Sequence, residues 1–255
     1  MKKCLSLCGA TLLAWSAFGA ANWPQFRGPG ASAVAPDGEP PIHFGPSSNV
    51  LWKVAFPAGN SSPVIWGDRL FLTAFDKPRL QTLCLNRHDG KTLWTGSVTP
   101  DKIEPVNRTS TPTAPTPVTD GERVYVYFGS FGLLAYDFEG REQWRLPLPP
   151  PVVDFGTGTS PILVGDLLIL TRDQDLGSEL LALDKRTGKT RWRVARPEFR
   201  RGFATPFVWQ HDGQEELIVP GSLWLRKGSV PQIVTYWPIA GTSLRLAQPC
   251  AVGWQ

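Results

Sequence analysis

Three copies of one short segment constrain the fold of this chain more than any other feature of its sequence. The last copy, residues 182–192, reads Ala-Leu-Asp-Lys-Arg-Thr-Gly-Lys-Thr-Arg-Trp, and residues 84–94 and 135–144 have the same shape. Each copy reads as a strand, a tight turn that contains glycine, and a second strand that carries tryptophan. An Asp before such a turn accepts hydrogen bonds from the turn's N–H groups, and glycine supplies the positive φ that the turn needs. The recurrence indicates a repeat protein.

Two independent sets of residues keep the period of this repeat. The tryptophans at positions 52, 94, 144 and 192 are separated by 42, 50 and 48 residues. A Ser-Pro or Thr-Pro pair begins at positions 62, 116, 160 and 205, which are 54, 44 and 45 residues apart. Four strand-like runs joined by tight turns fit between successive marks, and this is the pattern of one blade of a β-propeller.

These runs predict an all-β chain, a β-propeller of four-stranded antiparallel blades with about four to five blades present. The expected strands are 63–66, 69–74, 80–86 and 91–98, then 116–119, 124–129, 132–137 and 141–148, then 160–164, 167–171, 179–184 and 189–195, and finally 205–209 and 216–220. We expect the blades to span residues 61–225. Residues 22–60 are expected to form an N-terminal segment that is held to the blades by Trp23 and Phe26 and ends in the last strand of a partial blade.

Both ends of the sequence depart from the repeat. Residues 1–21 have two lysines, an apolar run and a small-residue cleavage site near Ala21, which predicts a signal peptide and export to the periplasm or the extracellular space. No later run is apolar enough to span a membrane. After residue 225 the pattern stops, and residues 226–255 are expected to be an irregular tail. Two explanations are open for this change: an unusual terminal segment, or a frameshift or truncation. We favour the second, which predicts an incomplete ring with open strand edges.

The repeated segment, Ala-x-Asp-x-x-Thr-Gly-x-x-x-Trp, resembles the tryptophan-docking repeat of the quinoprotein-like, or PQQ-like, β-propellers. Residues 22–29, 124–137 and 203–221 are also similar to this family, so the resemblance covers about residues 22–225. It implies that each tryptophan wedges against the next blade. The residues expected to dock the blades in this way are Trp52, Trp94, Trp144, Trp192, Gly90, Gly140, Gly188, Asp137 and Asp184.

The topology of a four-stranded blade predicts where a ligand would bind. Loops between strands two and three and loops between blades emerge on one face, which we call the loop face, while short turns occupy the opposite turn face. The loop face is expected to carry the candidate ligand-binding residues Asp154, Asp173, Asp175, Arg108, Arg200 and Arg201. The carboxylates are suited to Ca²⁺, and the arginines either pair with them or bind an anionic partner. Solvated charges and structural ion pairs are the favoured interpretation.

Two functions are consistent with the family resemblance, whose members include alcohol and sugar dehydrogenases and the outer-membrane assembly factor BamB. The first is a non-catalytic exported scaffold that binds another protein in the cell envelope. The alternative is a PQQ- and Ca²⁺-dependent alcohol or sugar dehydrogenase, or a degenerate remnant of one. Resemblance to the dehydrogenases implies an adjacent cysteine pair, whereas the cysteines after residue 21 are Cys84 and Cys250. We therefore favour the scaffold, with no cofactor and no catalytic residue.

The charge and the histidine content give no indication of a nucleic-acid partner or a metal site. The formal net charge is +4, and the charged residues are interspersed along the chain, so a nucleic-acid partner is not expected. The three histidines are scattered and have no metal-ligand spacing. The expected partner is another protein.

Overall fold

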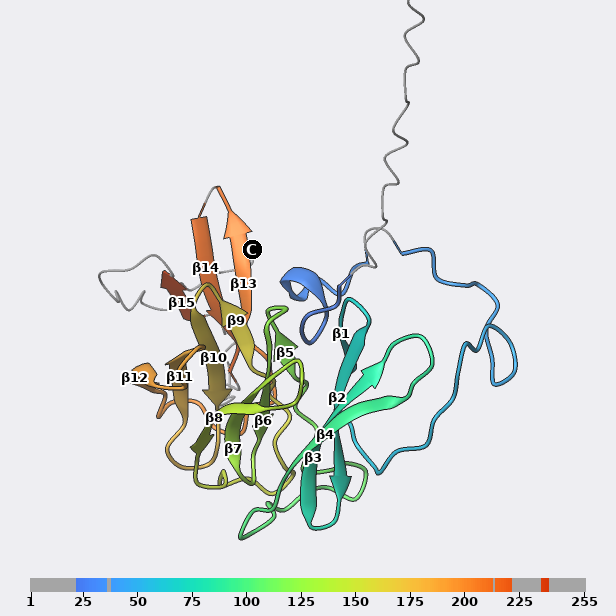
Figure 1. Cartoon of the computed structure of the whole chain (residues 1–255). Coiled ribbons are helices and arrows are strands. Elements are labelled where there is room, and N and C mark those ends of the chain that lie inside the picture. The colour runs from blue at the N-terminus through green and yellow to red at the C-terminus, as the bar shows by residue number, and fades with distance from the viewer. Residues whose placement is uncertain (1–21, 36–37, 213, 222–234, 239–255) are drawn as a thin grey trace, which may run out of the picture.

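A computed structural model describes residues 22–35, 38–212, 214–221 and 235–238 of the chain (Figure 1). Apart from one 3-10 turn, η1 (Pro29–Ala31), all of its regular elements are β-strands. The prediction of an all-β fold is confirmed. The expected signal peptide and most of the expected irregular tail lie outside the described residues.

Three sheets have four antiparallel strands each, and each sheet is one of the predicted units. The first blade contains β1 (Val64–Trp66), β2 (Arg69–Asp76), β3 (Arg79–Asn86) and β4 (Thr92–Val98); the second contains β5 (Val118–Thr119), β6 (Arg123–Phe128), β7 (Gly132–Asp137) and β8 (Glu142–Pro147); the third contains β9 (Ile162–Val164), β10 (Leu167–Arg172), β11 (Glu179–Asp184) and β12 (Thr190–Ala195). In each sheet consecutive strands are neighbours, as in the blades of a propeller.

The fourth sheet contains β13 (Phe207–His211), β14 (Gln214–Val219) and β15 (Thr235–Pro238). The sequence predicted no third strand after residue 225, and for residues 235–238 this was wrong. β15 pairs antiparallel to β14, with Leu217 opposite Trp237. Strand pairing uses backbone groups that every residue except proline supplies, so a strand can form where the turn and tryptophan signals of the repeat are missing.

Apolar residues of neighbouring blades form the cores. In β6, Val124, Val126 and Phe128 pack toward the first blade, while Tyr125 and Tyr127 pack toward the third. Because successive residues of a strand point to opposite faces, a sheet between two others is buried on both sides and reads as a continuous apolar run.

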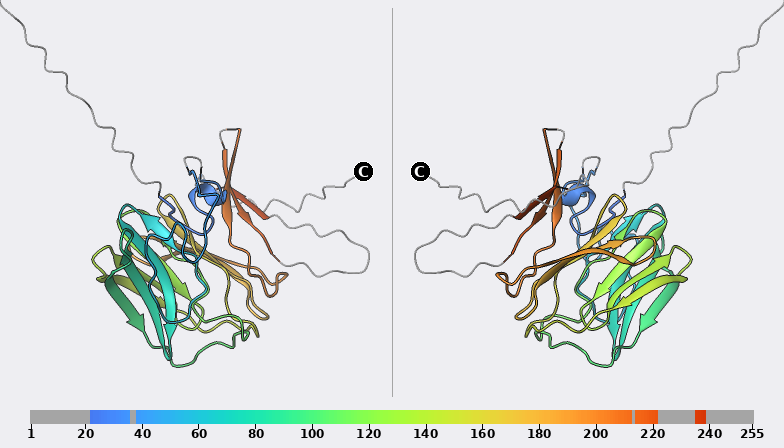
Figure 2. Two further views of the ribbon diagram at one scale, coloured as in Figure 1. Left: turned by 90° about the vertical axis from the view of Figure 1, so that its right-hand side faces the viewer. Right: turned by 90° about the vertical axis from the view of Figure 1, so that its left-hand side faces the viewer.

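A third cluster joins the third blade to the fourth sheet. Among the described residues no such cluster joins the fourth sheet to the first, and Figure 2 shows the sheets side by side in an open arc.

Tryptophan rings cross from one blade to the hairpin of the next. Trp94 Nε1 donates a hydrogen bond to the carbonyl of Phe138 at 2.8 Å, and Trp144 Nε1 donates to the carbonyl of Lys185 at 2.9 Å. Trp52, which precedes the first blade, makes the same contact with Arg87 at 2.8 Å. The rings lie against the turn glycines: a Cβ added to Gly90, Gly140 or Gly188 would lie 2.5, 2.7 or 2.6 Å from the nearest tryptophan atom. Only glycine leaves room for these contacts.

In the second and third blades an aspartate before the turn organises the hairpin. Asp184 Oδ1 accepts hydrogen bonds from the N–H groups of Arg186 and Thr187 at 3.0 and 2.9 Å. Asp137 Oδ1 accepts two equivalent bonds in the second blade. The Arg191 guanidinium and these N–H groups lower the pKa of Asp184 to about 2.

The Ser-Pro and Thr-Pro marks correspond to a chain of hydrogen bonds between blades. Ser62 N donates to Thr116 Oγ1 at 3.0 Å, Thr116 N donates to Ser160 Oγ at 2.9 Å, and Ser160 N donates to Thr205 Oγ1 at 3.1 Å. The acceptor in each bond is the hydroxyl oxygen of the Ser or Thr, which accounts for these two residue types at this position. The second period in the sequence thus has a physical cause that differs from the tryptophan contacts.

The N-terminal segment adds to the inner edges of the blades. Trp23 and Ile65 exchange backbone hydrogen bonds of 2.8 and 2.9 Å, and Thr119 N donates to the carbonyl of Pro24 at 2.9 Å. η1 continues to the fourth sheet and lies against β13 (Figure 1). The segment therefore contacts the first, second and fourth sheets at the turn face.

Candidate functional site on the loop face

Three loops of the second and third blades meet on the loop face, at the lower end of Figure 1. They are residues 148–161, 173–178 and 196–206. Asp175 N donates to the carbonyl of Val152 at 3.0 Å, and Arg196 N donates to the carbonyl of Ser178 at 2.8 Å. Backbone bonds therefore hold loops that are far apart in the sequence as one surface.

Four large apolar side chains are exposed on these loops. They are Val152, Phe155, Leu176 and Phe203, with exposed fractions of 52, 50, 74 and 48%. Exposed apolar side chains gathered beside arginine are typical of protein interaction surfaces. We call these four residues, together with Asp154, Asp175, Arg200 and Arg201, the loop-face patch.

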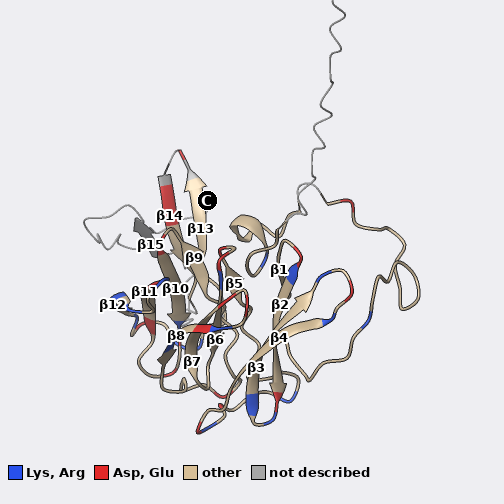
Figure 3. Cartoon of the chain, viewed as in Figure 1, with Lys and Arg blue, Asp and Glu red and all other residues tan. Residues whose placement is uncertain are grey.

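Arginine–aspartate pairs occupy the centre of the loop-face patch. Arg201 Nε contacts both carboxylate oxygens of Asp175 at 2.6 and 2.8 Å, and its Nη2 lies 2.9 Å from Asp154 Oδ2. Arg200 Nη2 donates to Asp175 Oδ1 at 3.0 Å. The hydrogen bond from Arg201 lowers the pKa of Asp175. Acidic and basic residues are intermixed at this end of the molecule (Figure 3), which favours a partner that also carries both signs of charge.

Asp173 lies beneath the patch in a buried ion pair. Its carboxylate accepts two hydrogen bonds from Arg196, at 2.8 and 3.0 Å, and the two side chains are 1 and 2% exposed. Arg196 also stacks on Phe199, 4.0 Å from the ring centroid, and a Cβ on Gly221 would overlap this ring. The pair therefore joins a loop of the third blade to the end of β14.

A second buried carboxylate, Glu104, lies in the loop before the second blade. Its Oε2 accepts a hydrogen bond from Thr157 at 2.5 Å, and its Oε1 has no hydrogen-bond partner among the described residues. Burial raises the pKa of Glu104 to about 7, although Arg172 acts in the opposite direction. A group that titrates near neutrality is suited to proton transfer. The neighbouring cavity, which Tyr127 and Thr157 help to line, has a volume of about 10 Å³, so it admits one water molecule and no substrate.

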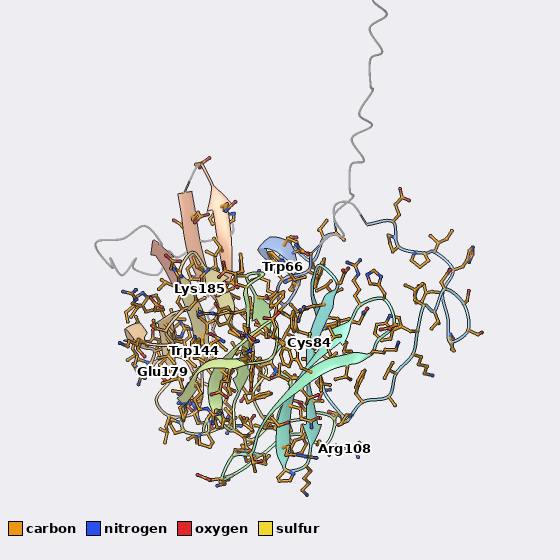
Figure 4. All side chains as sticks on the ribbon, viewed as in Figure 1. Trp66, Cys84, Arg108, Trp144, Glu179 and Lys185 are labelled. Atoms are coloured by element: carbon orange, nitrogen blue, oxygen red, sulfur yellow. The ribbon has the colours of Figure 1, made fainter. Side chains whose placement is uncertain are left out.

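The structure separates the six residues that the sequence grouped on the loop face. Asp154, Asp175, Arg200 and Arg201 come together in the loop-face patch. Asp173 is buried against Arg196, and Arg108 is exposed on the loop after β4 (Figure 4). The buried residues Glu104, Arg172, Glu179 and Arg196 carry no repeat signal, and sequence analysis missed them.

The carboxylates of this face do not fit the Ca²⁺ site of the dehydrogenase hypothesis. Asp154, Asp173 and Asp175 each bind a guanidinium group, so their oxygens already have cationic partners. Within the described ranges no three His, Cys, Asp or Glu residues lie in a group that could hold a metal ion. The donor set is that of structural ion pairs.

Comparison with known proteins identifies the family. A family model described as outer membrane protein assembly factor BamB matches residues 44–214, more than half of the chain. The chain belongs to this family. The BamB family match covers the three complete blades and the start of the fourth sheet, and it agrees with the propeller blades of the structure. No curated protein matches the sequence.

Solved structures resemble the chain at low sequence identity. BamB from Moraxella catarrhalis is 16% identical with a TM-score of 0.44, and the match covers 66% of this chain and 48% of that one. The quinohemoprotein alcohol dehydrogenase of Comamonas testosteroni is 15% identical with a TM-score of 0.49, and the match covers 70% of this chain and 28% of that one.

The quinohemoprotein alcohol dehydrogenase ADHIIG of Pseudomonas putida HK5 is 16% identical with a TM-score of 0.43, covering 57% of this chain and 22% of that one. The chain thus spans less than half of the length of each of these three solved chains. In the part of the chain that the structure describes, no helix has the length and apolar character needed to cross a membrane.

Proposed function

We propose that this chain is an exported, non-catalytic propeller that binds a protein of outer-membrane assembly through the loop-face patch. The proposal includes a signal peptide at residues 1–21, removed near Ala21, and a cell-envelope location for the blades at 61–225. The observation that carries it is the patch itself, in which four exposed apolar side chains lie on the same loops as a network of arginine–aspartate pairs. The BamB family match supports the choice of partner.

The patch has the chemistry of an interaction site because its charges are positioned in advance. Exposed ion pairs contribute only about 0–1 kcal/mol to stability, so the fold does not depend on them. Arg201 lies 5.9 Å from the Phe155 ring centroid and is bound by two carboxylates, which restricts its side chain before a partner arrives. Arginine and aromatic residues of this kind dominate the binding energy of many interfaces.

Catalysis has weaker support on this face. Among the described residues here, Glu104 has a pKa near neutrality, but it is buried, and the neighbouring cavity, at about 10 Å³, is too small for a substrate. The aspartates, which the dehydrogenase hypothesis assigned to Ca²⁺, are bound to arginines. Enclosed, paired acids of this kind are more typical of a structural network than of an active site.

Co-purification tests the proposal. The full chain, tagged and expressed in a bacterium with an outer membrane, is expected to retain an outer-membrane assembly protein. Phe203→Asp is expected to weaken this binding by more than about tenfold, because an aromatic side chain at an interface is replaced by a charge. Leu93→Asp is the matched control, since Leu93 and Phe203 are both 48% exposed and Leu93 lies in β4 outside the patch.

Two results would contradict the proposal. Equal loss of binding with Phe203→Asp and Leu93→Asp would show that the patch is not the site. Dye-linked alcohol oxidation by the chain with added PQQ and Ca²⁺ would favour the dehydrogenase alternative.

A further inference from the structure

A groove of about 390 Å³ opens on the turn face, at the opposite end of the blades from the loop-face patch. Its walls include Trp66, Asp120, Leu163, Lys185, Val208 and Glu215. Trp66 and Lys185 both lie at the upper end of the molecule in Figure 4. The groove therefore lies between the inner strands of the second, third and fourth sheets, beside the N-terminal segment.

The repeat gives four related backbone positions, three of which line this groove. They lie three residues after the Ser or Thr of each mark, and they are Ile65, Thr119, Leu163 and Val208. In the first blade, Trp66 and Arg69 flank a two-residue turn, so the N–H and C=O of the preceding residue, Ile65, point away from β2. The third blade has the same register, with Val164 opposite Leu167, and Leu163 therefore points its backbone groups in the same direction.

The N-terminal segment already pairs with two of these four positions. Ile65 exchanges two backbone bonds with Trp23, and Thr119 N donates to Pro24. No backbone partner of this kind faces Leu163 or Val208 among the described residues. An unpaired strand edge offers a ready template for another extended chain.

We propose that the turn-face groove binds an extended peptide segment of a partner protein, which adds to β9 at Leu163 as residues 22–24 add to β1. Pro24 and Gln25 line the groove, so the bound peptide would continue an interface that the chain already makes with itself. This site does not depend on the function proposed for the loop face.

Charge narrows the chemistry of this peptide. Asp120 is bound to Lys185 at 3.2 Å and accepts a hydrogen bond from the Tyr125 hydroxyl at 3.1 Å. Glu215 is exposed and accepts a hydrogen bond from Gln210 at 2.8 Å, and no ion pair joins it to a Lys or Arg within the part of the chain that the structure describes. The two carboxylates exceed the one lysine of the groove, so an extended peptide with an arginine or lysine matches it.

A peptide with the sequence of residues 22–30, Asn-Trp-Pro-Gln-Phe-Arg-Gly-Pro-Gly, provides the probe. It carries a fluorophore and is titrated with the full chain by fluorescence anisotropy. We expect saturable binding, and N-methylation of the peptide's tryptophan amide should weaken it by roughly two- to tenfold, the effect of one lost hydrogen bond. This comparison leaves the protein unchanged, so it holds even if a protein variant does not fold.

Two protein variants locate the site. Leu163→Pro removes an N–H group that lies outside the β9–β10 ladder, which an edge strand tolerates, and it should weaken binding to the same extent. Ile65→Pro is the matched comparison: it removes the equivalent N–H at a position outside the groove lining, where Trp23 already binds, so it should weaken peptide binding less than Leu163→Pro does.

The proposal is overturned by the absence of saturable binding up to about 1 mM peptide, by unchanged affinity of the N-methylated peptide, or by weakening with Ile65→Pro and not with Leu163→Pro. In the first case the groove does not accept an added strand. In the last, the peptide displaces the N-terminal segment.

Discussion

Replacing Trp144 with alanine removes the side chain that packs the second blade against the third. Its ring is 9% exposed, lies against Gly188, and is 6.0 Å from the Tyr125 ring centroid. Its Nε1 donates to the carbonyl of Lys185 at 2.9 Å. Truncation of a buried tryptophan costs about 3–5 kcal/mol, because the cavity that remains collapses only in part. The Lys185 carbonyl also loses its donor, so we expect a cost toward the upper end of this range.

Urea and thermal denaturation of the full chain measure this cost. For a domain of this size a loss of 3–5 kcal/mol corresponds to a fall in melting temperature of roughly 6–20 °C. Trp144→Phe keeps part of the packing and loses the hydrogen bond, so its melting temperature should lie between those of the parent and Trp144→Ala. Leu176→Ala is the control, since Leu176 is 74% exposed and should cost no more than about 0.5 kcal/mol. A Trp144→Ala variant that melts like the parent would refute the docking role.

Three further predictions concern single contacts, each measured by the free energy of unfolding. Gly188→Ala should cost about 1–3 kcal/mol more than Gly165→Ala, because both glycines have positive φ but only Gly188 has a tryptophan ring within 4 Å of an added Cβ; equal costs would contradict the contact. Ser160→Ala should cost about 1–3 kcal/mol, since the buried Thr116 N–H loses its acceptor, and a neutral result would contradict the hydrogen-bond chain. The pKa of Glu104 rises on folding from its ordinary value of 4.5 to about 7, so its contribution to the free energy of unfolding is fully present below pH 4.5 and falls by on the order of 3 kcal/mol as pH rises to about 7. Glu104→Gln should remove this pH dependence, and an unchanged slope between pH 5 and 8 would show that Glu104 does not titrate in this range.

Sequence analysis predicted the blades well because local chemistry specifies them. The turn at Asp184 and Gly188 needs residues only a few positions apart, and the tryptophan at position 192 follows on the next strand. Because the prediction relied on these local signals, it missed β15, a strand that forms without a repeat signal. Trp192 is half-buried on the third blade, and a glycine turn to receive it does not occur within the described residues.

The candidate site was predicted only in part because its contacts are long-range. The sequence placed Asp173 and Asp175 in one group, yet burial separates them: Asp173 is enclosed with Arg196, and Asp175 faces the patch with Arg201. Glu104 and Thr157 lie 53 residues apart on loops that have no period. Only the folded arrangement of the blades brings such loops together, so spacing in the sequence carried no signal for them.

Site-specific photo-cross-linking tests most directly whether the loop-face patch binds an outer-membrane assembly protein, as we propose. A photoreactive amino acid at position 203, in the patch, is compared in cells with the same amino acid at position 93, in β4, since the native side chains at the two positions are equally exposed. We predict a discrete cross-linked product from position 203, which mass spectrometry identifies as an outer-membrane assembly protein, and none from position 93. The same products from both positions, or no product from position 203, would contradict the account.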